Sequence, residues 1–386
     1  MTMPFIDLKA QFRELETDIR ARMDAVLAHG QYVMGPEIKE LEEKLAAFAG
    51  VKNAIACSSG TDALLLALMA HGVGPGDAIF TTPFTFIATA EVISLLGATP
   101  VYVDVDPETF NIDPEALRLA IRAVKMGDAG KYPLPTGAGK LTPKGIIPVD
   151  IFGVPADYDS IMELADRHGL FVLQDAAQSF GSQYNGVRAG ALGHVSATSF
   201  FPAKPLGCYG DGGAVFTDDD EMAQLMRSLM VHGMGTHKYD NDRIGINGRL
   251  DTLQAAVLLP KLSVFAAELD QRQRVADRYS MLLSKLAGFT FQKVPEGCRS
   301  AWAQYSIVHE RREEIQTALQ EAGIPSVVYY PKPLHIQTAF ADLGYTAEDM
   351  PVSMHLARNI FSLPMHPYMS DEQVDEVCGV IAEALA

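Results

Sequence analysis

One lysine of the sequence is a candidate nucleophile. Lys204 occurs in the stretch Ser199-Phe-Phe-Pro-Ala-Lys-Pro-Leu-Gly-Cys-Tyr-Gly-Asp-Gly-Gly213, between apolar residues and a glycine-rich turn. Burial among such residues disfavours the charged ammonium, lowers the pKa of the amine and makes the neutral amine available for attack on a carbonyl. Lys204 is therefore a candidate for forming a Schiff base.

A second stretch has the features of a phosphate-binding site. Ser58-Ser-Gly60-Thr61-Asp62 follows an apolar run and precedes a helical pattern. A helix that begins there presents free backbone N–H groups and a partial positive charge to an anion. An ordinary N-cap is the alternative, because Ser, Thr and Asp all favour that position. Neither GxGxxG nor GxxxxGK[ST] follows a strand, so a dinucleotide or ATP site lacks its usual fingerprint.

A carboxylate completes the set of candidate groups. Asp175 ends the apolar run Phe171–Gln174, and an N-cap for a following helix is again the alternative. A phosphate cradle, a carboxylate and a reactive lysine are together what a pyridoxal phosphate enzyme needs. The carboxylate keeps the ring nitrogen protonated, and the lysine bonds to the aldehyde. An aromatic residue should cover the ring, and we expect Phe86 rather than Phe84 to do so, with Phe84 in the core.

The elements that must position these groups alternate between short apolar runs and helical patterns from Asn53 to about Phe216. Such alternation is typical of an α/β fold with a doubly wound, mostly parallel sheet, in which ligands bind at the carboxyl ends of the strands. The expected strands are Ala54–Cys57, Ala78–Phe80, Pro100–Asp104, Gly145–Val149 and Phe171–Asp175. The expected helices are Thr61–His71, Ala88–Leu96, Pro114–Ala123 and Tyr158–His168.

The alternation fades after about residue 217, which predicts a second, smaller α+β domain. We expect a large domain over residues 1–255 and a small C-terminal domain over residues 256–386. Residues 124–144 are rich in Gly and Pro and should form an exposed loop. The remaining expected elements are helices at Asp219–Met230, Thr252–Ser280 and Asp371–Leu385, and strands at Ala303–Val308 and Pro325–Tyr330.

The composition excludes several classes of function. The chain has 386 residues, and 31 Lys and Arg against 48 Asp and Glu give a net charge of −17, which disfavours a nucleic-acid partner. The longest uninterrupted apolar run, Ala63–Ala70, is far short of the roughly 20 residues that cross a bilayer, so no membrane association is expected. Asp7 and Lys9 interrupt any signal peptide. Four scattered cysteines without a CxxC pair predict no metal site and a reduced, cytoplasmic protein.

The residues that carry these candidate roles also form motifs that resemble a known family. These motifs are Gly35-Pro-Glu37, Ser59-Gly-Thr-Asp-Ala-Leu64, Thr82-Pro-Phe-Thr-Phe86, Asp175-Ala-Ala-Gln-Ser179, Ser199–Lys204 and Gly245-Ile-Asn-Gly-Arg-Leu-Asp-Thr-Leu-Gln-Ala-Ala256. Over nearly the whole chain the sequence resembles the sugar aminotransferases of the DegT/DnrJ/EryC1/StrS family, which have the aspartate aminotransferase fold type I. The resemblance implies a pyridoxal phosphate enzyme with a large α/β domain and a small C-terminal domain.

The resemblance also implies a role for each cofactor residue. Lys204 bonds to the cofactor and, once displaced by the amino donor, moves the proton between the donor's α-carbon and the cofactor. Asp175 pairs with the pyridinium nitrogen, and Gln178 bonds the phenolic oxygen. The phosphate is held by Gly60, Thr61 and Ser199, and Phe86 stacks on the ring. Asn247 matches an asparagine that reaches the phosphate from the neighbouring subunit, which implies a homodimer with shared active sites.

Within the family, the motifs around Lys204, Arg249–Lys261 and Ser362–Tyr368 are most similar to those of enzymes that aminate C3 of UDP-2-acetamido-2-deoxy-3-keto-glucuronic acid. Those enzymes serve surface polysaccharide (O-antigen) synthesis, and L-glutamate is the family's usual donor. Arg249 would contact this UDP-linked keto sugar, with a dimer ion pair as the alternative. Tyr330 and His335 would contact sugar or diphosphate, with packing in the small domain as the alternative.

Three competing functions can be compared with the C3 aminotransferase. A transaminase acting at C4 of a keto-deoxysugar shares the cofactor motifs and differs only in its sugar pocket. A sugar dehydratase of the same family has histidine in place of the lysine, and Lys204 argues against it. A non-catalytic member of the family would have lost one or more cofactor residues, whereas all are present.

Overall fold

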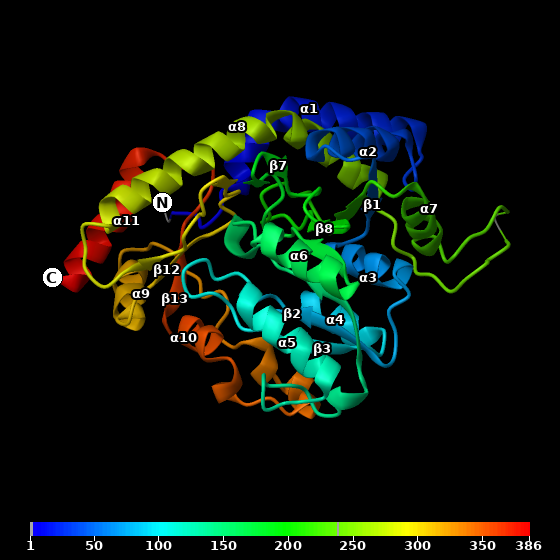
Figure 1. The fold of residues 1–386 in the computed structure, drawn as a ribbon. Coiled ribbons are helices and arrows are strands. Elements are labelled where there is room, and N and C mark those ends of the chain that lie inside the picture. Colours follow the sequence, from blue (N-terminus) through cyan, green and yellow to red (C-terminus); the bar gives the residue numbers. More distant parts are fainter. Residues whose placement is uncertain (1–2, 238) are drawn as a thin grey trace.

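The computed structural model describes residues 3–237 and 239–386 of the chain (Figure 1). A seven-stranded sheet lies at its centre, in the strand order β1-β9-β8-β5-β4-β2-β3. The strands β8, β5, β4, β2 and β3 run parallel to one another, and β9 pairs antiparallel with β1 and β8. The strands are β1 (Asn53–Cys57), β2 (Asp77–Thr81), β3 (Thr99–Tyr102), β4 (Thr142–Ile147), β5 (Phe171–Asp175), β8 (Val195–Ser199) and β9 (Gly213–Thr217).

Helices cover both faces of this sheet, because successive residues of each strand point to opposite faces. Ile79 packs with Leu173 and Val215 under one group of helices, whereas its neighbour Phe80 packs with Val172 under the other. The first group comprises α3 (Gly60–Ala70), α4 (Ala88–Leu95) and α7 (Asp220–Leu229), and the second comprises α5 (Pro114–Met126) and α6 (Tyr158–His168). The predicted doubly wound α/β fold is confirmed.

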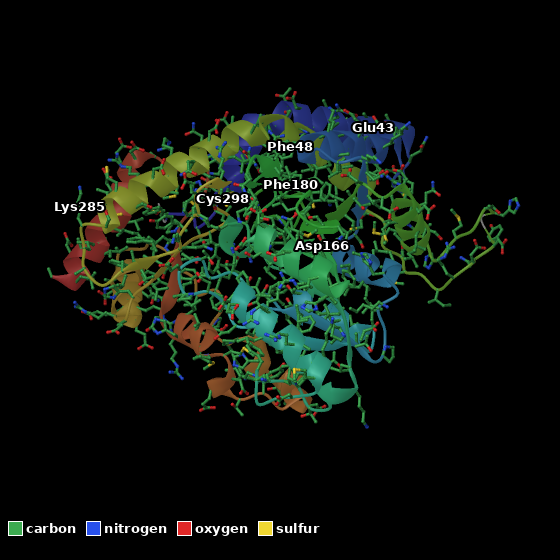
Figure 2. The ribbon with its side chains drawn as sticks, viewed as in Figure 1. Glu43, Phe48, Asp166, Phe180, Lys285 and Cys298 are labelled. Atoms are coloured by element: carbon green, nitrogen blue, oxygen red, sulfur yellow. The ribbon has the colours of Figure 1, made fainter. Side chains whose placement is uncertain are left out.

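A third apolar cluster joins the sheet to the long helices that cross the top of the molecule in Figure 1. These helices are α2 (Pro36–Ala49) and α8 (Thr252–Leu283), and α1 (Leu8–His29) packs on α8 through a smaller cluster of Leu15, Ile19 and Val257. Phe180 lies at the centre of the cluster, with its ring centroid 5.4 Å from that of Phe48 on α2 and 5.9 Å from that of Phe265 on α8. Figure 2 shows Phe48 and Phe180 beneath these helices. α8 therefore forms part of the core.

In the described part of the chain, α8 is the one helix with the length and apolar composition of a membrane span. Its most apolar window is 61% buried inside the protein. Burial of this extent is also what the core helix of a folded domain shows, and it matches the packing of α8 against Phe180.

The C-terminal part of the chain forms a small three-stranded sheet of antiparallel pairs in the order β10-β12-β13. Its elements are β10 (Thr290–Phe291), β12 (Tyr305–Val308), β13 (Ile360–Leu363), α9 (Arg312–Glu321), α10 (Pro351–Asn359) and α11 (Asp371–Leu385). The short strands β6 (Gln183–Tyr184), β7 (Val187–Arg188) and β11 (Cys298–Arg299) form a further sheet. The domain division after residue 255 stays a prediction, and helix α8 continues through that point.

Two expected segments differ from the structure. The strand expected at Pro325–Tyr330 is wrong: only Val327 forms a bridge, to Ser362, because the two tyrosines that follow turn to pack against Phe5 and Phe84. The expectation of an exposed loop over residues 124–144 is wrong in part. Tyr132 packs on the core, and its hydroxyl accepts a hydrogen bond from the Asp104 N–H at 2.9 Å.

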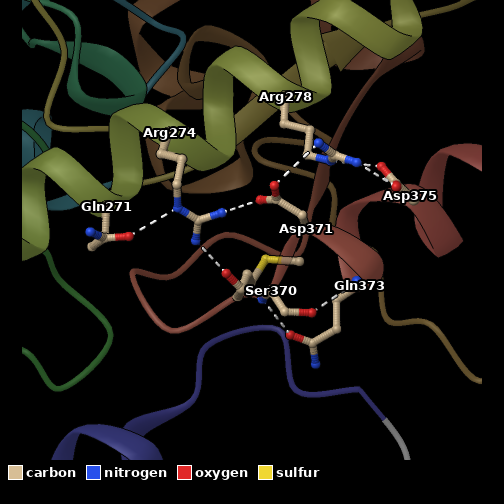
Figure 3. A network of polar contacts seen from close by, with 8 residues as sticks. Gln271, Arg274, Arg278, Ser370, Asp371, Gln373 and Asp375 are labelled. Atoms are coloured by element: carbon tan, nitrogen blue, oxygen red, sulfur yellow. Dashed lines mark hydrogen bonds and ion pairs between the residues drawn. The ribbon is translucent and has the colours of Figure 1, made fainter.

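Ion pairs connect α8 to the C-terminal helix α11 (Figure 3). Arg278 donates from Nε to Asp375 Oδ1 at 2.7 Å and from Nη1 to Asp371 Oδ2 at 3.2 Å. Arg274 also contacts Asp371, and its Nε donates to Gln271 at 2.9 Å. These side chains are partly exposed, so each pair contributes little alone, but the shared Asp371 makes them a network.

A buried carboxylate of the large sheet caps a helix of the C-terminal part. Asp104 follows β3, and its Oδ1 accepts hydrogen bonds from the Ser353 N–H at 2.9 Å and the Ser353 hydroxyl at 2.6 Å. Its Oδ2 accepts from the Val352 N–H at 2.9 Å. Because α10 begins at Pro351, these are first-turn N–H groups that have no partner within the helix. Asp104 thus acts as an N-cap from a distant part of the chain.

Replacing this cap should destabilise the protein. We expect Asp104→Ala to lower the free energy of unfolding by about 2–3 kcal/mol, because it leaves several buried donors unpaired. Urea unfolding followed by circular dichroism measures the change. Asp128→Ala is the control, because the Asp128 carboxylate accepts the nearby Gly130 N–H in an exposed turn. Equal stability of the two variants would contradict the capping role.

Candidate active site

Asp175 lies at the carboxyl end of β5 in the centre of the sheet, where the doubly wound fold places ligands. The residue is buried, and its Oδ2 accepts a hydrogen bond from the Thr89 hydroxyl at 2.8 Å. Thr89 Oγ1 is in turn 3.2 Å from Thr85 Oγ1. Burial raises the pKa of Asp175, and the bonds from Thr89 and the Ala177 N–H and the charge of Lys204 act against that rise. Asp175 is thus a hydrogen-bonded buried carboxylate beside a cation.

Lys204 lies in the irregular turn between β8 and β9, and its backbone N–H donates to the Phe201 carbonyl at 2.9 Å. Burial lowers the pKa of the Lys204 amine, and the charge of Asp175 acts in the opposite direction. A lower pKa increases the fraction of neutral amine near pH 7, the form that attacks a carbonyl. The structure therefore brings together the two groups that the sequence places 29 residues apart.

The predicted phosphate cradle lies at the N-terminus of α3. Ser59 is the N-cap of α3, and its hydroxyl accepts the Asp62 N–H at 3.0 Å. The first helical residue, Gly60, lies against Ser199 so closely that an added Cβ would be 2.6 Å from Ser199 Cβ. The N-cap interpretation is confirmed for Ser59, and it leaves the first-turn N–H groups of Gly60 and Thr61 beside the Ser199 hydroxyl for an anion.

Gln178 and Tyr330 form a second polar pair near Asp175. Gln178 donates from Nε2 to the Tyr330 hydroxyl at 2.9 Å, and its Oε1 accepts the Phe152 N–H at 2.7 Å. Tyr330 packs edge-on against the fully buried Phe84, so the expectation that Phe84 belongs to the core is confirmed. Burial raises the pKa of Tyr330. Tyr330 therefore contacts both the core residue Phe84 and the side chain of Gln178.

Asn247 and Arg249 lie beside the first turn of α3, on a segment that pairs with β1. The backbone of Arg249 bridges to Cys57, and the Ser58 N–H donates to the Gly248 carbonyl at 2.9 Å. Both residues line a hollow of about 740 Å³. Its other lining residues are Val33, Ser58, Ser59, Asp62, Gly210, Asp211, Asp251 and Gln254.

The two remaining predicted residues differ in exposure. Phe86 is 56% exposed, two residues before α4 begins at Ala88. His335 is buried, and neither of its ring nitrogens has a hydrogen-bond partner among residues 3–237 and 239–386. Burial lowers the pKa of His335. The neighbouring Leu334 N–H donates to the Pro83 carbonyl at 2.8 Å, which ties this segment to the turn that carries Phe86.

Sequence reasoning missed the residues that support the site. Thr89 holds Asp175 from α4, but a threonine inside a helix gives no signal of this contact. Asp150 is fully buried, and it accepts from Gln174 and Ser179, both at 2.7 Å, and from Tyr158 at 2.9 Å. Burial raises the pKa of Asp150 to about 6. Its position directly after an expected strand was the one available signal.

The groups present fit pyridoxal phosphate. Gly60 packs against Ser199 at the N-terminus of α3, where first-turn N–H groups can bind a phosphate. Asp175 is a buried carboxylate that can hold a ring-nitrogen proton, and Lys204 supplies the amine. These groups account for the phosphate, the ring nitrogen and the aldehyde of the cofactor. Together with the doubly wound sheet and the appended C-terminal part, this site defines a pyridoxal phosphate-dependent enzyme of fold type I.

Comparison with known proteins gives the family. The model of the DegT/DnrJ/EryC1/StrS aminotransferase family matches residues 13–382, and the chain belongs to this family. It is 46% identical over 380 residues to the UDP-2-acetamido-2-deoxy-3-oxo-D-glucuronate aminotransferase of Pseudomonas aeruginosa, covering 98% of this chain and 99% of that protein. The family resemblance seen in the sequence is confirmed, and the protein is an aminotransferase that depends on pyridoxal phosphate.

Solved structures agree with this assignment. A DegT/DnrJ/EryC1/StrS aminotransferase from Brucella abortus superposes with a TM-score of 0.94 at 50% identity, covering all of both chains. The PLP form of the sugar aminotransferase Spr1654 from Streptococcus pneumoniae superposes with a TM-score of 0.87 at 27% identity, again over all of both chains. The cofactor predicted from the sequence is thus the one found in a structural relative.

The contact between Gly60 and Ser199 gives a test of the cradle. We expect Gly60→Ala to weaken pyridoxal phosphate binding about 10- to 100-fold, because the new methyl group must displace the end of β8 at a cost of about 1–3 kcal/mol. Titration of the apoprotein, followed by protein fluorescence, measures the affinity. Gly379→Ala is the matched control, since a Cβ there meets open space. Unchanged affinity in Gly60→Ala would show that the phosphate binds elsewhere.

Proposed function

We propose that the protein transfers the amino group of L-glutamate to C3 of UDP-2-acetamido-2-deoxy-3-keto-glucuronic acid. The observation that carries the aminotransferase part is the placement of Lys204 beside the buried Asp175, next to the cradle at Gly60. The similarity to the Pseudomonas aeruginosa enzyme over nearly the full length of both chains supports this sugar acid as the acceptor. We place the reaction in the cytoplasm, in the synthesis of a bacterial surface polysaccharide such as O-antigen.

The proposed mechanism assigns each polar group one task. Bound pyridoxal phosphate supplies the electron sink that makes the α-proton of the amino donor acidic. Asp175 holds a proton at the ring nitrogen, and Thr89 keeps the carboxylate ionised and correctly oriented. Lys204, whose pKa is lowered by burial, removes the α-proton as a neutral amine and returns it to a neighbouring atom. The same steps run in reverse with the keto sugar after 2-oxoglutarate has left.

Gln178 and Tyr330 are proposed to orient the cofactor and the sugar. Their hydrogen bond fixes the side chain of Gln178, whose amide is also held by the Phe152 N–H. Gln178 is then positioned to bond the phenolic oxygen of the cofactor, and Phe86 has the exposure needed for stacking against its ring. Tyr330 and His335 are proposed sugar contacts; the unpaired ring nitrogens of the buried His335 can serve hydroxyl or carboxylate groups.

The hollow that contains Arg249 supports a homodimer. Three carboxylates, of Asp62, Asp211 and Asp251, share it with that one arginine. A UDP-sugar acid carries about three negative charges, so a single chain offers it an unfavourable environment at this hollow, and further groups must come from elsewhere. A second copy of the chain that covers the hollow is our proposal, with Asn247 reaching the phosphate of the neighbouring site.

Exposed apolar side chains around the same hollow give this proposal independent support. Val33 lines the hollow and is 50% exposed, and its neighbours Tyr32 and Met34 are exposed to a similar extent. Contiguous apolar exposure of this kind is typical of a protein–protein interface.

Val33→Glu should disrupt the dimer, because it places a charge in the apolar contact. We expect the mass in solution to fall from twice the chain mass of 41.8 kDa to that of a single chain. Size-exclusion chromatography with light scattering measures it. Met126→Glu is the control, because Met126 is also exposed but lies at the end of α5. A wild-type protein that elutes as a monomer would overturn the proposal directly.

The aminotransferase reaction is tested by the absorption spectrum of the purified holoenzyme. We expect L-glutamate to convert a visible band into a near-ultraviolet band, with release of 2-oxoglutarate. Lys204→Ala should abolish this conversion, and Asp175→Asn should slow it by about 10³-fold or more, since the neutral amide cannot hold the ring-nitrogen proton. A folded Lys204→Ala variant with normal turnover would refute the assignment.

The acceptor is tested in the second half of the same experiment. Adding the UDP-linked 3-keto sugar acid should restore the visible band, and nuclear magnetic resonance of the product should place nitrogen at C3. A dTDP-linked 4-keto-6-deoxysugar should leave the near-ultraviolet band unchanged. Restoration by the 4-keto sugar alone would establish the rival C4 reaction. A response to neither compound, with a normal response to L-glutamate, would leave the aminotransferase assignment intact and reject the proposed sugar.

A further inference from the structure

A lysine on α8 is buried beneath the turn that carries Lys204. Lys261 is 0% exposed, and its Nζ donates a hydrogen bond of 2.7 Å to the Gly207 carbonyl. The same ammonium lies 4.1 Å from the centre of the Tyr209 ring. A buried charge is costly unless it is paired or hydrogen-bonded, so a lysine at this position suggests a specific task.

The turn that Lys261 contacts is irregular. Residues 200–212 contain no helix or strand, so each of their buried carbonyl groups needs an individual donor. Within the turn, the Lys204 N–H bonds the Phe201 carbonyl at 2.9 Å and the Cys208 N–H bonds the Phe200 carbonyl at 2.7 Å. The Gly207 carbonyl points instead to α8, where Lys261 is its donor.

Gly207 is coupled to Lys204 by close packing. A Cβ added at Gly207 would lie 2.6 Å from the Pro202 carbonyl oxygen and 2.7 Å from that of Phe201. The two sides of the turn, residues 201–202 and residue 207, therefore touch through their backbones, and Lys204 lies between them in the chain. Movement of Gly207 would shift the backbone that sets the direction of the Lys204 side chain.

A second residue of α8 holds the same turn. Gln254 accepts the Tyr209 N–H through Oε1 at 2.9 Å. Gln254 and Lys261 are seven residues apart, or about two helical turns, so they lie on the same face of α8. The helix that is embedded in the core thus fixes both ends of the Gly207–Tyr209 segment.

We propose that Lys261 is a positioning residue for the reaction, which holds the Lys204 turn in place through its hydrogen bond to the Gly207 carbonyl and its contact with Tyr209. This inference depends on the proposed role of Lys204. Lys261 does not touch the reacting atoms, and its effect is transmitted by the backbone from Gly207 to Lys204.

The electrostatic surroundings of Lys261 agree with this role. Burial lowers the pKa of its ammonium to about 8, and Glu268 on α8 and Cys208 in the turn act in the opposite direction. Glu268 is itself engaged by Gln11, whose Nε2 donates to it at 2.9 Å, and by the Tyr368 hydroxyl. The partner that Lys261 bonds is therefore the Gly207 carbonyl, rather than an acidic side chain.

The test compares Lys261→Met with Arg272→Met. Both variants remove a buried cation from α8, but Arg272 donates to the Trp302 carbonyl at 3.0 Å and to the Met365 carbonyl at 3.5 Å, neither of which belongs to the Lys204 turn. Each holoenzyme is titrated with pH while its visible band is recorded, is then treated with borohydride, and is analysed by mass spectrometry for cofactor attached to Lys204. Thermal unfolding and the rate of the half-reaction with L-glutamate are measured in parallel.

We expect both variants to unfold at lower temperature than the wild type, and only Lys261→Met to differ in the site. The pH at which its visible band is half converted should rise by about half a unit or more, because a loosened turn exposes the Lys204 nitrogen to water. Its half-reaction should slow about 10- to 100-fold. If Lys261→Met does not fold, Lys261→Gln, which keeps an N–H donor but is shorter, should show a smaller shift in the same direction.

The outcomes separate this inference from the proposed function. Wild-type protein in which borohydride attaches no cofactor to Lys204 would refute the role of Lys204, and with it the inference. The positioning role alone would be overturned by a different result. In that case cofactor attaches normally to Lys204 in the wild type, and the pH midpoint of the visible band and the rate of the half-reaction are the same in the wild type, the Lys261 variant and Arg272→Met.

Discussion

The structure depends on keeping two opposite charges, those of Asp175 and Lys204, partly shielded from water at the carboxyl edge of one sheet. Burial alone would neutralise both, since it raises the pKa of the carboxyl and lowers that of the amine. Each charge opposes that effect on the other, and the Thr89 hydroxyl gives the carboxylate further support. The result is a carboxylate that can stay ionised and an amine that can lose its proton, as transamination requires.

The helices around the sheet supply the positions for this balance. α3 presents its N-terminus at Gly60 because Ser199 at the end of β8 packs directly against it. α8 fills the core around Phe180 and also reaches the turn between β8 and β9 through Gln254 and Lys261. One rigid helix therefore couples core packing to the segment that carries the reactive lysine, and the ion pairs to α11 attach the C-terminal part to the same helix.

The sequence predicted those elements whose patterns are local. The alternation of apolar runs located β1 to β5 and the helices between them, because each strand is a short apolar run bounded by turns. The expected strand at Pro325–Tyr330 failed because pattern alone does not show that Tyr330 will turn to meet Gln178. Tyr132 was misplaced for a related reason, since its partner Asp104 is remote in sequence.

What the sequence determined by itself is the chemistry: the lysine, the carboxylate, the candidate phosphate-binding turn and the family motifs are all readable as residue types in order. The tertiary structure alone decided which side chains support them. Thr89, Asp150 and Lys261 act through contacts between segments far apart in the chain, and no spacing rule connects such segments before the sheet is formed. The same reason applies to the hydrogen bond between Tyr330 and Gln178, which joins residues 152 positions apart in the chain.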